Sequence, residues 1–128
     1  MHWDRYRRKK DRIPLSLPVT IRFRDADRHE QTCRGQVVDA SKSGLRIKVD
    51  RFFRREAVLY LTLHFPERLR ANQVGTENYH TYAVVAHWKK YSAEDFEIGV
   101  KLLHDKIPAN VEPFRIEKGI TTIMPHRK

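Results

Sequence analysis

Two short groups of polar residues in this sequence have the types and spacing that suit binding of an anionic ligand. The first is a pair of arginines four positions apart, Arg8 and Arg12, in a segment rich in cations. An arginine guanidinium carries a planar fork of N–H donors, and this fork can hold a phosphate by two parallel hydrogen bonds. Alone, the spacing says little, because Arg24 and Arg28 share it in an arginine-rich chain.

The second group is a polar connection between two apolar runs, residues 39–44 (D-A-S-K-S-G). Asp39 supplies a carboxylate acceptor, Ser41 supplies a small hydroxyl, and Gly44 permits positive φ or a close approach of another backbone. Residues of these types are also common in tight turns that bind nothing. Alone, this group therefore does not separate a binding turn from a structural one.

The elements that must position these groups are predicted to be short β-strands. Val19, Ile21 and Phe23 alternate with polar residues, which is the period-two pattern of a half-buried strand. Residues 25–28 suit a hairpin turn after that strand. Six such strands, with no alternation of strands and helices, predict an antiparallel barrel or sandwich. The expected strands are residues 18–24, 35–38, 45–49, 57–65, 82–88 and 96–103.

Composition divides the chain into three expected parts. Residues 1–13 hold six cations against two acids and show no apolar periodicity, so we expect a flexible basic arm that carries the arginine pair. Residues 14–104 are the expected β domain, with a long polar loop at residues 66–79. Residues 105–128 form a C-terminal extension, in which a short helix could start after Pro108.

The charge balance restricts the class of partner. The 128 residues contain 26 Lys and Arg against 16 Asp and Glu, a formal net charge of +10. This surplus attracts nucleotides, nucleic acids and anionic membranes without choosing among them. Cys33 is the only cysteine, which excludes an intramolecular disulfide, and no apolar run reaches the roughly 20 residues that span a bilayer. We therefore expect a soluble, cytoplasmic protein with no membrane span.

The residues that usually carry catalysis show no supporting pattern. The seven histidines have no H-x-H or H-E-x-x-H spacing, and the sequence contains no G-x-S-x-G motif and no P-loop. His87, which precedes Trp88 in an expected strand, is interpreted as a surface or packing residue. We expect a protein that is not an enzyme and that holds no metal and no cofactor.

The order of the two polar groups resembles the PilZ domain family. An arginine pair directly before the first strand is followed by Asp-x-Ser-x-x-Gly at the end of the second strand. Residues 12–19, 35–39, 44–47 and 98–103 also look like the strands that flank these motifs in the family. The likeness runs from about Arg7 to Leu103, which is most of the chain.

This resemblance implies a six-stranded antiparallel β-barrel that binds the bacterial second messenger cyclic di-GMP. It assigns Arg8 and Arg12 to the arginine pair of the family, and Asp39, Ser41 and Gly44 to its second motif, with no motif position substituted. The residue types suit the ligand. A guanidinium fork matches a phosphate or the O6 and N7 acceptors of guanine, and a carboxylate matches the N1–H and N2–H₂ donors.

Two further residues complete the candidate site, Arg7 through the resemblance and Trp88 through its place in an expected strand. Arg7 precedes the pair, and an arginine there is associated in this family with two mutually intercalated ligand molecules. We therefore expect cyclic di-GMP to bind as an intercalated dimer. Trp88 has two interpretations: packing on a strand face, which we favour, or a platform on which a guanine stacks near the site.

The resemblance also leads to a hypothesis of mechanism. The ligand neutralises the basic arm, the arm folds over the barrel beside residues 39–44, and a downstream effector protein reads the changed surface. An alternative is that the basic arm, with Trp3 and Tyr6, binds single-stranded nucleic acid by phosphate contacts and base stacking. An unspecific RNA binder, however, has no need of Asp39, Ser41 and Gly44.

Overall fold

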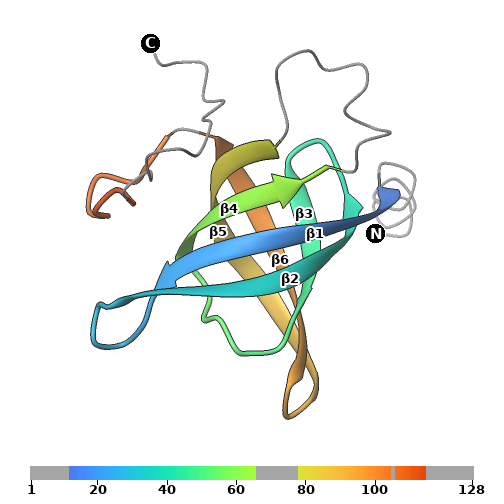
Figure 1. Ribbon diagram of the computed structural model, residues 1–128, viewed down its shortest axis with the longest axis horizontal. Coiled ribbons are helices and arrows are strands. Elements are labelled where there is room, and N and C mark those ends of the chain that lie inside the picture. Colours follow the sequence, from blue (N-terminus) through green and yellow to red (C-terminus); the bar gives the residue numbers. More distant parts are fainter. Residues whose placement is uncertain (1–11, 66–77, 105, 115–128) are drawn as a thin grey trace, which may run out of the picture.

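The computed structural model describes residues 12–65, 78–104 and 106–114, and these form a closed barrel of six antiparallel strands (Figure 1). The strand order around the barrel is β1-β2-β3-β6-β5-β4. The six-stranded antiparallel barrel expected from the sequence is confirmed. The strands are β1 (Ile13–Arg24), β2 (Glu30–Ala40), β3 (Gly44–Val49), β4 (Val58–His64), β5 (Asn78–Ser92) and β6 (Asp95–His104).

Five of the six strands are longer than their apolar patterns predict, most clearly at the start of β1, whereas β4 is one residue shorter than expected at each end. Strand β1 begins at Ile13 although Pro14 and Pro18 cannot donate a backbone hydrogen bond. Strand β1 pairs with β4 only at residues 19–22. Pro14 and Pro18 therefore pair with β2 on one side and have no partner strand on the other. Strand β5 likewise begins at Asn78, inside the predicted loop at residues 66–79, of which residues 66–77 lie outside the described part.

Alternating side chains fill the inside of the barrel. Val19 and Ile21 of β1, for example, are fully buried, whereas Thr20 and Arg22 lie on the outer face between them. The buried positions of the six strands form one continuous cluster, which consists mainly of Val, Leu and Ile. Its fully buried members include Leu17, Val19, Ile21, Val37, Ile47, Leu59, Leu61, Ala83, Val85 and Ile98.

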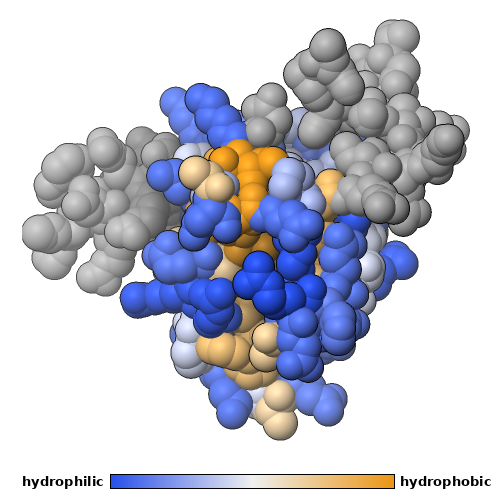
Figure 2. Space-filling model, turned by 90° about the vertical axis from the view of Figure 1, so that its left-hand side faces the viewer, coloured by the Kyte–Doolittle hydropathy of each residue, from blue (hydrophilic) through white to orange (hydrophobic). Residues whose placement is uncertain are grey.

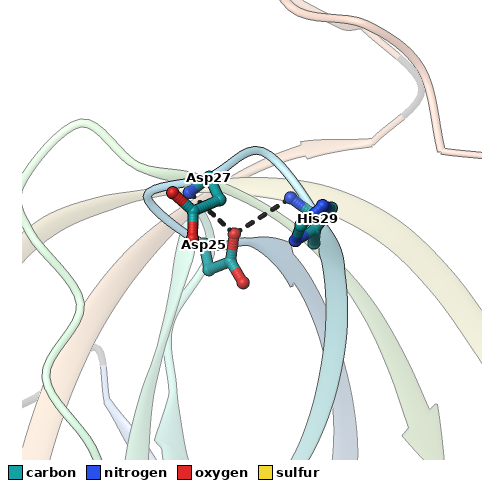
Figure 3. Close-up of side chains that lie close together, drawn as sticks. All are labelled: Asp25, Asp27 and His29. Atoms are coloured by element: carbon teal, nitrogen blue, oxygen red, sulfur yellow. Dashed lines mark hydrogen bonds between the residues drawn. The ribbon is translucent and has the colours of Figure 1, made fainter.

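The turn between β1 and β2 is closed by the side chain of Asp25 (Figure 3). Its Oδ1 accepts hydrogen bonds from the backbone N–H groups of Asp27 and His29, both at 2.9 Å. The bond from His29 is the main reason why the pKa of Asp25 lies below its usual value. Arg28 has a positive φ of 68°. The hairpin turn predicted at residues 25–28 is confirmed.

A second, smaller cluster lies on the outer face of β4 and β5, where the C-terminal segment 106–114 crosses them. Phe114 is buried against Tyr60 and Tyr82, and its backbone N–H donates to the Tyr82 hydroxyl at 3.0 Å. Arg24 of β1 donates to the carbonyl oxygens of Glu112 and Pro113 at 2.9 and 3.1 Å. Its guanidinium also lies 4.2 Å from the centroid of the Phe114 ring.

The short helix expected after Pro108 is absent from residues 106–114. The N–H of Val111 bonds to the carbonyl of Pro108 at 3.0 Å, which makes a single turn that does not continue. Pro113 cannot donate a helical hydrogen bond, and Phe114 is held by Tyr82 instead. Residues 115–128, the rest of the predicted extension, lie outside the described part.

Polar side chains cover most of the face that Figure 2 presents. Figure 2 shows one face, on which hydrophilic side chains surround a smaller apolar area. Among the residues described, no helix has the length and apolar character needed to cross a bilayer.

Candidate functional site

The start of β1 and the end of β2 bring Arg12 and Asp39 together. Strand pairing places Ile13 opposite Ala40 and Pro14 opposite Asp39, so the residue before β1 lies beside the Asp39 carboxylate. Nε of Arg12 is 3.4 Å from Oδ1 of Asp39, and both side chains are largely buried. The two polar groups singled out in the sequence therefore meet at this point. Arg7 and Arg8 lie outside the described residues.

The connection from β2 to β3 is a tight turn. The N–H of Ser41 donates to the carbonyl of Gly44 at 2.9 Å, and the N–H of Leu102 in β6 donates to the carbonyl of Ser43 at 2.9 Å. A Cβ atom at Gly44 would stand 2.5 Å from the carbonyl oxygen of Val100. A glycine is thus needed for the close approach of β6, which is the second of the two reasons considered from the sequence.

Arg46 of β3 is a member of the site that the sequence analysis did not identify. It lies opposite Asp39, and its Nη2 and Nε donate to Oδ2 of Asp39 at 2.6 and 3.0 Å. Its Nη1 is 3.6 Å from Oε1 of Glu97 in β6. The hydrogen bond to Asp39 is the main cause that raises the pKa of Arg46. Arg46 thereby holds the Asp39 carboxylate in one orientation.

The two oxygens of Asp39 have different surroundings. Oδ2 accepts both hydrogen bonds from Arg46, whereas Oδ1 is buried and accepts no hydrogen bond from the described residues. Arg12 approaches Oδ1 as an ion pair at 3.4 Å without completing a hydrogen bond. A buried acceptor without a donor costs about 1–3 kcal/mol. One oxygen of the site is therefore held by two hydrogen bonds, and the other is buried beside the Arg12 guanidinium without a hydrogen bond.

The pairing of the strands extends this arrangement into a row across the outer face of the barrel. Asp39 lies opposite Arg46, Arg46 opposite Gly99, and Gly99 opposite His87 of β5. A side chain at Gly99 would overlap the His87 ring, so the imidazole lies directly over the glycine. The row thus presents the Asp39 carboxylate, the Arg46 guanidinium and the His87 ring in that order. Such a row can hold a planar base by acceptor, donor and stacking contacts.

Trp88 lies apart from this row. It is paired with Ile98, a residue that points into the barrel, while Asp39 and Arg46 belong to the outward-facing row of Gly99. The Trp88 ring contacts Phe52 and Phe96, with centroid distances of 4.9 and 6.4 Å. The structure therefore groups Trp88 with other aromatic residues and does not bring it to Asp39.

His87 and Arg46 could be recognised only through the strand register. In the sequence, Arg46 is one of several outward cations and His87 is a lone histidine. Their alignment with Asp39 depends on three strand pairings and on register shifts in β2 and β5. The one feature of the sequence that could have indicated Arg46 as a site residue is its position two residues after the turn glycine Gly44.

Comparisons with known proteins agree with this architecture. The family model described as PilZ domain matches residues 6–111. A solved structure entitled "Structure of Bacillus subtilis Inhibitor of motility (MotI/DgrA)" is similar with a TM-score of 0.52 and 20% sequence identity. The match covers 77% of this chain and 43% of that chain, so this chain spans less than half of its neighbour. No curated protein matches the sequence.

Proposed function

This chain belongs to the PilZ domain family, and we propose that it is a receptor for cyclic di-GMP. The observation that carries the proposal is the meeting of Arg12 and Asp39, which lie 3.4 Å apart and come from the two motifs of the family. PilZ domains are binding modules that serve as receptors or adaptors. Membership of this family agrees with the expectation from the sequence that the chain is a binding protein and not an enzyme.

The Asp39 carboxylate suits the donor edge of guanine. The N1–H and N2–H₂ groups of that base need an acceptor, and Oδ1 of Asp39 is buried without a hydrogen-bond donor. A guanine that donates to Oδ1 removes the cost of this unsatisfied atom, which adds to the free energy of binding. The bond from Arg46 to Oδ2 keeps the carboxylate oriented for this contact.

The arginines suit the remaining groups of the ligand. Cyclic di-GMP has two phosphates, and each guanine offers O6 and N7 as a pair of acceptors. We assign these acceptors to Arg8 and Arg12, because a guanidinium fork satisfies either pair with two hydrogen bonds. The hydroxyl of Ser41 and the close backbone at Gly44 complete the turn side of the site. The ring of His87 offers a face for a guanine at the far end of the row.

The stoichiometry follows from the residue before the arginine pair. With Arg7 as a further guanidinium, the arm can hold two intercalated ligand molecules, so we propose two cyclic di-GMP per protomer. Titration calorimetry measures this number directly. One ligand per protomer would contradict the intercalated mode and leave the receptor proposal standing.

The output is proposed to be a rearrangement of the basic arm that a downstream effector protein reads. Ligand phosphates neutralise the six cations of residues 1–13, and part of the contact energy offsets the entropy lost when the arm is ordered. Amide hydrogen exchange of residues 5–12 tests this step. Equal protection with and without ligand would rule it out.

The receptor proposal is tested by titrating cyclic di-GMP into the protein and into Arg12→Ala and Asp39→Ala variants. Each substitution removes a charge-assisted contact worth about 1.5–3 kcal/mol, so the Kd should rise about tenfold or more. Arg51→Ala is the matched control, because this arginine is paired with Asp50 and lies away from the row. An equal loss in the control would show that charge, and not this site, binds the ligand.

A further inference from the structure

The C-terminal segment 106–114 contacts the outside of the barrel mainly through its last residue. Phe114 is 4% exposed, and its ring lies against Tyr60 and Tyr82 with centroid distances of 6.1 and 6.2 Å. Ile107 adds a partly buried contact to the same cluster. Most of the other residues of the segment are exposed, namely Lys106, Ala109, Asn110, Glu112 and Pro113. One aromatic side chain therefore provides most of the apolar contact between this segment and the barrel.

Two arginines of β1 complete the surroundings of the Phe114 ring. Cζ of Arg24 and Cζ of Arg22 lie 4.2 and 5.4 Å from the ring centroid, within the range of a cation–π contact. Glu30 of β2 is ion-paired with both arginines, at 3.2 Å from Arg22 and 3.7 Å from Arg24, and so helps to hold them beside the ring. We call the four residues that surround the ring the Phe114 site: Arg22, Arg24, Tyr60 and Tyr82.

The Phe114 site also binds the backbone around the ring. Nη1 and Nη2 of Arg24 donate to the carbonyl oxygens of Glu112 and Pro113 at 2.9 and 3.1 Å, and the Tyr82 hydroxyl accepts from the N–H of Phe114 at 3.0 Å. Pro113 has a fixed φ and favours an extended residue before it, so the bound conformation is partly ordered in advance. The groups that are bound are two carbonyls, one N–H and one ring, and a Pro–aromatic pair of any protein carries them.

The barrel is closed without the C-terminal segment. The strands that pair around the barrel all lie within residues 13–104. None of the described residues 106–114 belongs to the cluster that fills the barrel, because Phe114 forms a separate cluster with Tyr60 and Tyr82 on the outer face. Release of the segment therefore uncovers the two tyrosines without opening the core, which is a local opening of lower free energy than unfolding.

We propose that the Phe114 site is a docking site for a Pro–aromatic segment of a partner protein, and that residues 112–114 of the chain itself cover it until the partner displaces them. The contacts of Glu112, Pro113 and Phe114 identify the occupant, because the partner segment makes the same ones. A short connection joins residues 112–114 to β6, so their effective concentration at the site is on the order of millimolar. The site is therefore closed in the absence of a partner.

A second copy of the chain is a poorer occupant than a separate partner. The Pro–Phe pair of a second copy is itself held in its own Phe114 site. The net charge of +10 on each chain also opposes association of two copies. A partner without these two disadvantages competes more effectively.

The Phe114 site lies away from the candidate ligand site. Arg24 ends β1 and Ile13, next to Arg12, begins it, so the two sites are separated by the 12-residue strand, about 36 Å at 3.3 Å per residue. Docking at the Phe114 site does not require cyclic di-GMP, and the experiments below use none. The docking proposal and the receptor proposal can therefore fail separately.

The first measurement is amide hydrogen exchange of the unmodified full chain. If the segment leaves the barrel locally, the N–H of Phe114 should exchange at least tenfold faster than the amides of β4 in the barrel wall. Equal exchange would show that segment and barrel open only together, which would overturn the proposal. This measurement does not depend on any variant.

The second experiment adds a capped peptide of sequence GSEPFSG to the full ¹⁵N-labelled chain carrying Phe114→Ala. The peptide should shift the amide signals of residues 22–24, 58–60 and 80–82, with a Kd at least tenfold lower than for the unmodified chain, in which residues 112–114 compete. No shift, or equal affinity for both chains, would overturn the proposal. Loss of the folded amide spectrum in Phe114→Ala would overturn it too, because the segment would then be a fixed part of the barrel.

Matched controls define the partner and the site. The peptide GSEPASG should not bind, GSEGFSG should bind at least threefold more weakly, and equal binding of either would overturn the assigned partner class. Adding Arg24→Ala to Phe114→Ala should weaken binding of GSEPFSG more than tenfold, whereas adding Arg51→Ala should not, and equal effects would overturn the assigned site. Sedimentation tests the other occupant: a concentration-dependent dimer that Phe114→Ala abolishes would assign the site to a second copy and overturn a separate partner.

Discussion

Asp39 illustrates how one carboxylate can serve two partners. Arg46 binds Oδ2 through two N–H groups, and Arg12 approaches Oδ1 without completing a hydrogen bond. Glu97 holds the third nitrogen of Arg46 at 3.6 Å, which limits the rotation of its guanidinium. The carboxylate is thus oriented before any ligand arrives, and little further ordering of this residue is needed on binding.

Replacing Arg46 should therefore weaken ligand binding although Arg46 is not one of the family motif residues. In Arg46→Ala, the Asp39 carboxylate loses its two donors and can rotate toward Arg12, so we expect the Kd for cyclic di-GMP to rise about tenfold. The preference over the inosine analogue, which lacks the N2 amino group, should shrink as well. Lys48→Ala, on the same face of β3, is the control. Tighter binding in Arg46→Ala would mean that Arg46 competes with guanine for Asp39.

His64 should make the stability of the barrel depend on pH. Its pKa lies below the ordinary value of 6.5, first because of burial and second because of Arg34. Since the folded pKa is depressed, the unfolded chain binds the proton more readily. The stability contributed by neutral His64 is complete above pH 6.5 and is lost as the pH falls below that value.

Urea unfolding of the protein and of His64→Gln at several pH values measures this effect. The glutamine can still reach Thr20, which bonds to Nε2 of His64 at 2.7 Å. The stability of the protein should fall more steeply than that of the variant between pH 7 and pH 5. Equal slopes would show that other groups control the acid side of the stability curve.

At the scale of elements, the strands could be predicted from the sequence and their register could not. Alternation or a short apolar run between polar turns identified every strand, because each strand buries one face in the barrel. In a regular strand Tyr82 and Trp88, six residues apart, would face the same side, but a register shift between Val85 and His87 separates them. Tyr82 consequently packs on the outer face with Phe114, and Trp88 lies over Phe52.

The candidate site likewise contains residues that the sequence predicts and residues that only the strand register brings together. Asp39, Ser41, Gly44 and Arg12 are close to motifs that can be read along the chain. Arg46 and His87 reach the site only through pairing across β2, β3, β6 and β5. Contacts between strands depend on the whole barrel, so residue types and local spacing do not determine them.

The β2–β3 turn should be sensitive to a single methyl group. In Gly44→Ala, the added Cβ would stand 2.5 Å from a backbone oxygen of Val100, so either the turn or β6 must move. Overpacking of this kind typically costs about 1–3 kcal/mol, and displacement of Ser41 should also weaken ligand binding. Urea unfolding and titration of Gly44→Ala measure both effects. Ser43→Ala, at an exposed position of the same turn, is the control, and comparable losses there would contradict this explanation.

At the scale of the whole molecule, the net charge of +10 raises the question of whether binding is specific or only electrostatic. A positive barrel attracts any polyanion, and the strength of that attraction depends steeply on salt. A site built around Asp39 behaves differently, because a carboxylate repels phosphates and gains only from a base that donates hydrogen bonds. The two kinds of binding therefore respond differently to salt and to the loss of Asp39.

This difference can be measured by titrating cyclic di-GMP and a single-stranded oligonucleotide at several salt concentrations. Cyclic di-GMP has two phosphates, so its logarithmic slope should be no steeper than about −1.4, at roughly −0.7 for each phosphate of a single strand. An oligonucleotide that contacts more phosphates should show a steeper slope. Asp39→Ala should weaken cyclic di-GMP binding and leave oligonucleotide binding equal or stronger, since it removes a negative charge. If Asp39→Ala affects neither ligand and both slopes are steep, the chain binds polyanions through its charge alone, and the receptor proposal is wrong.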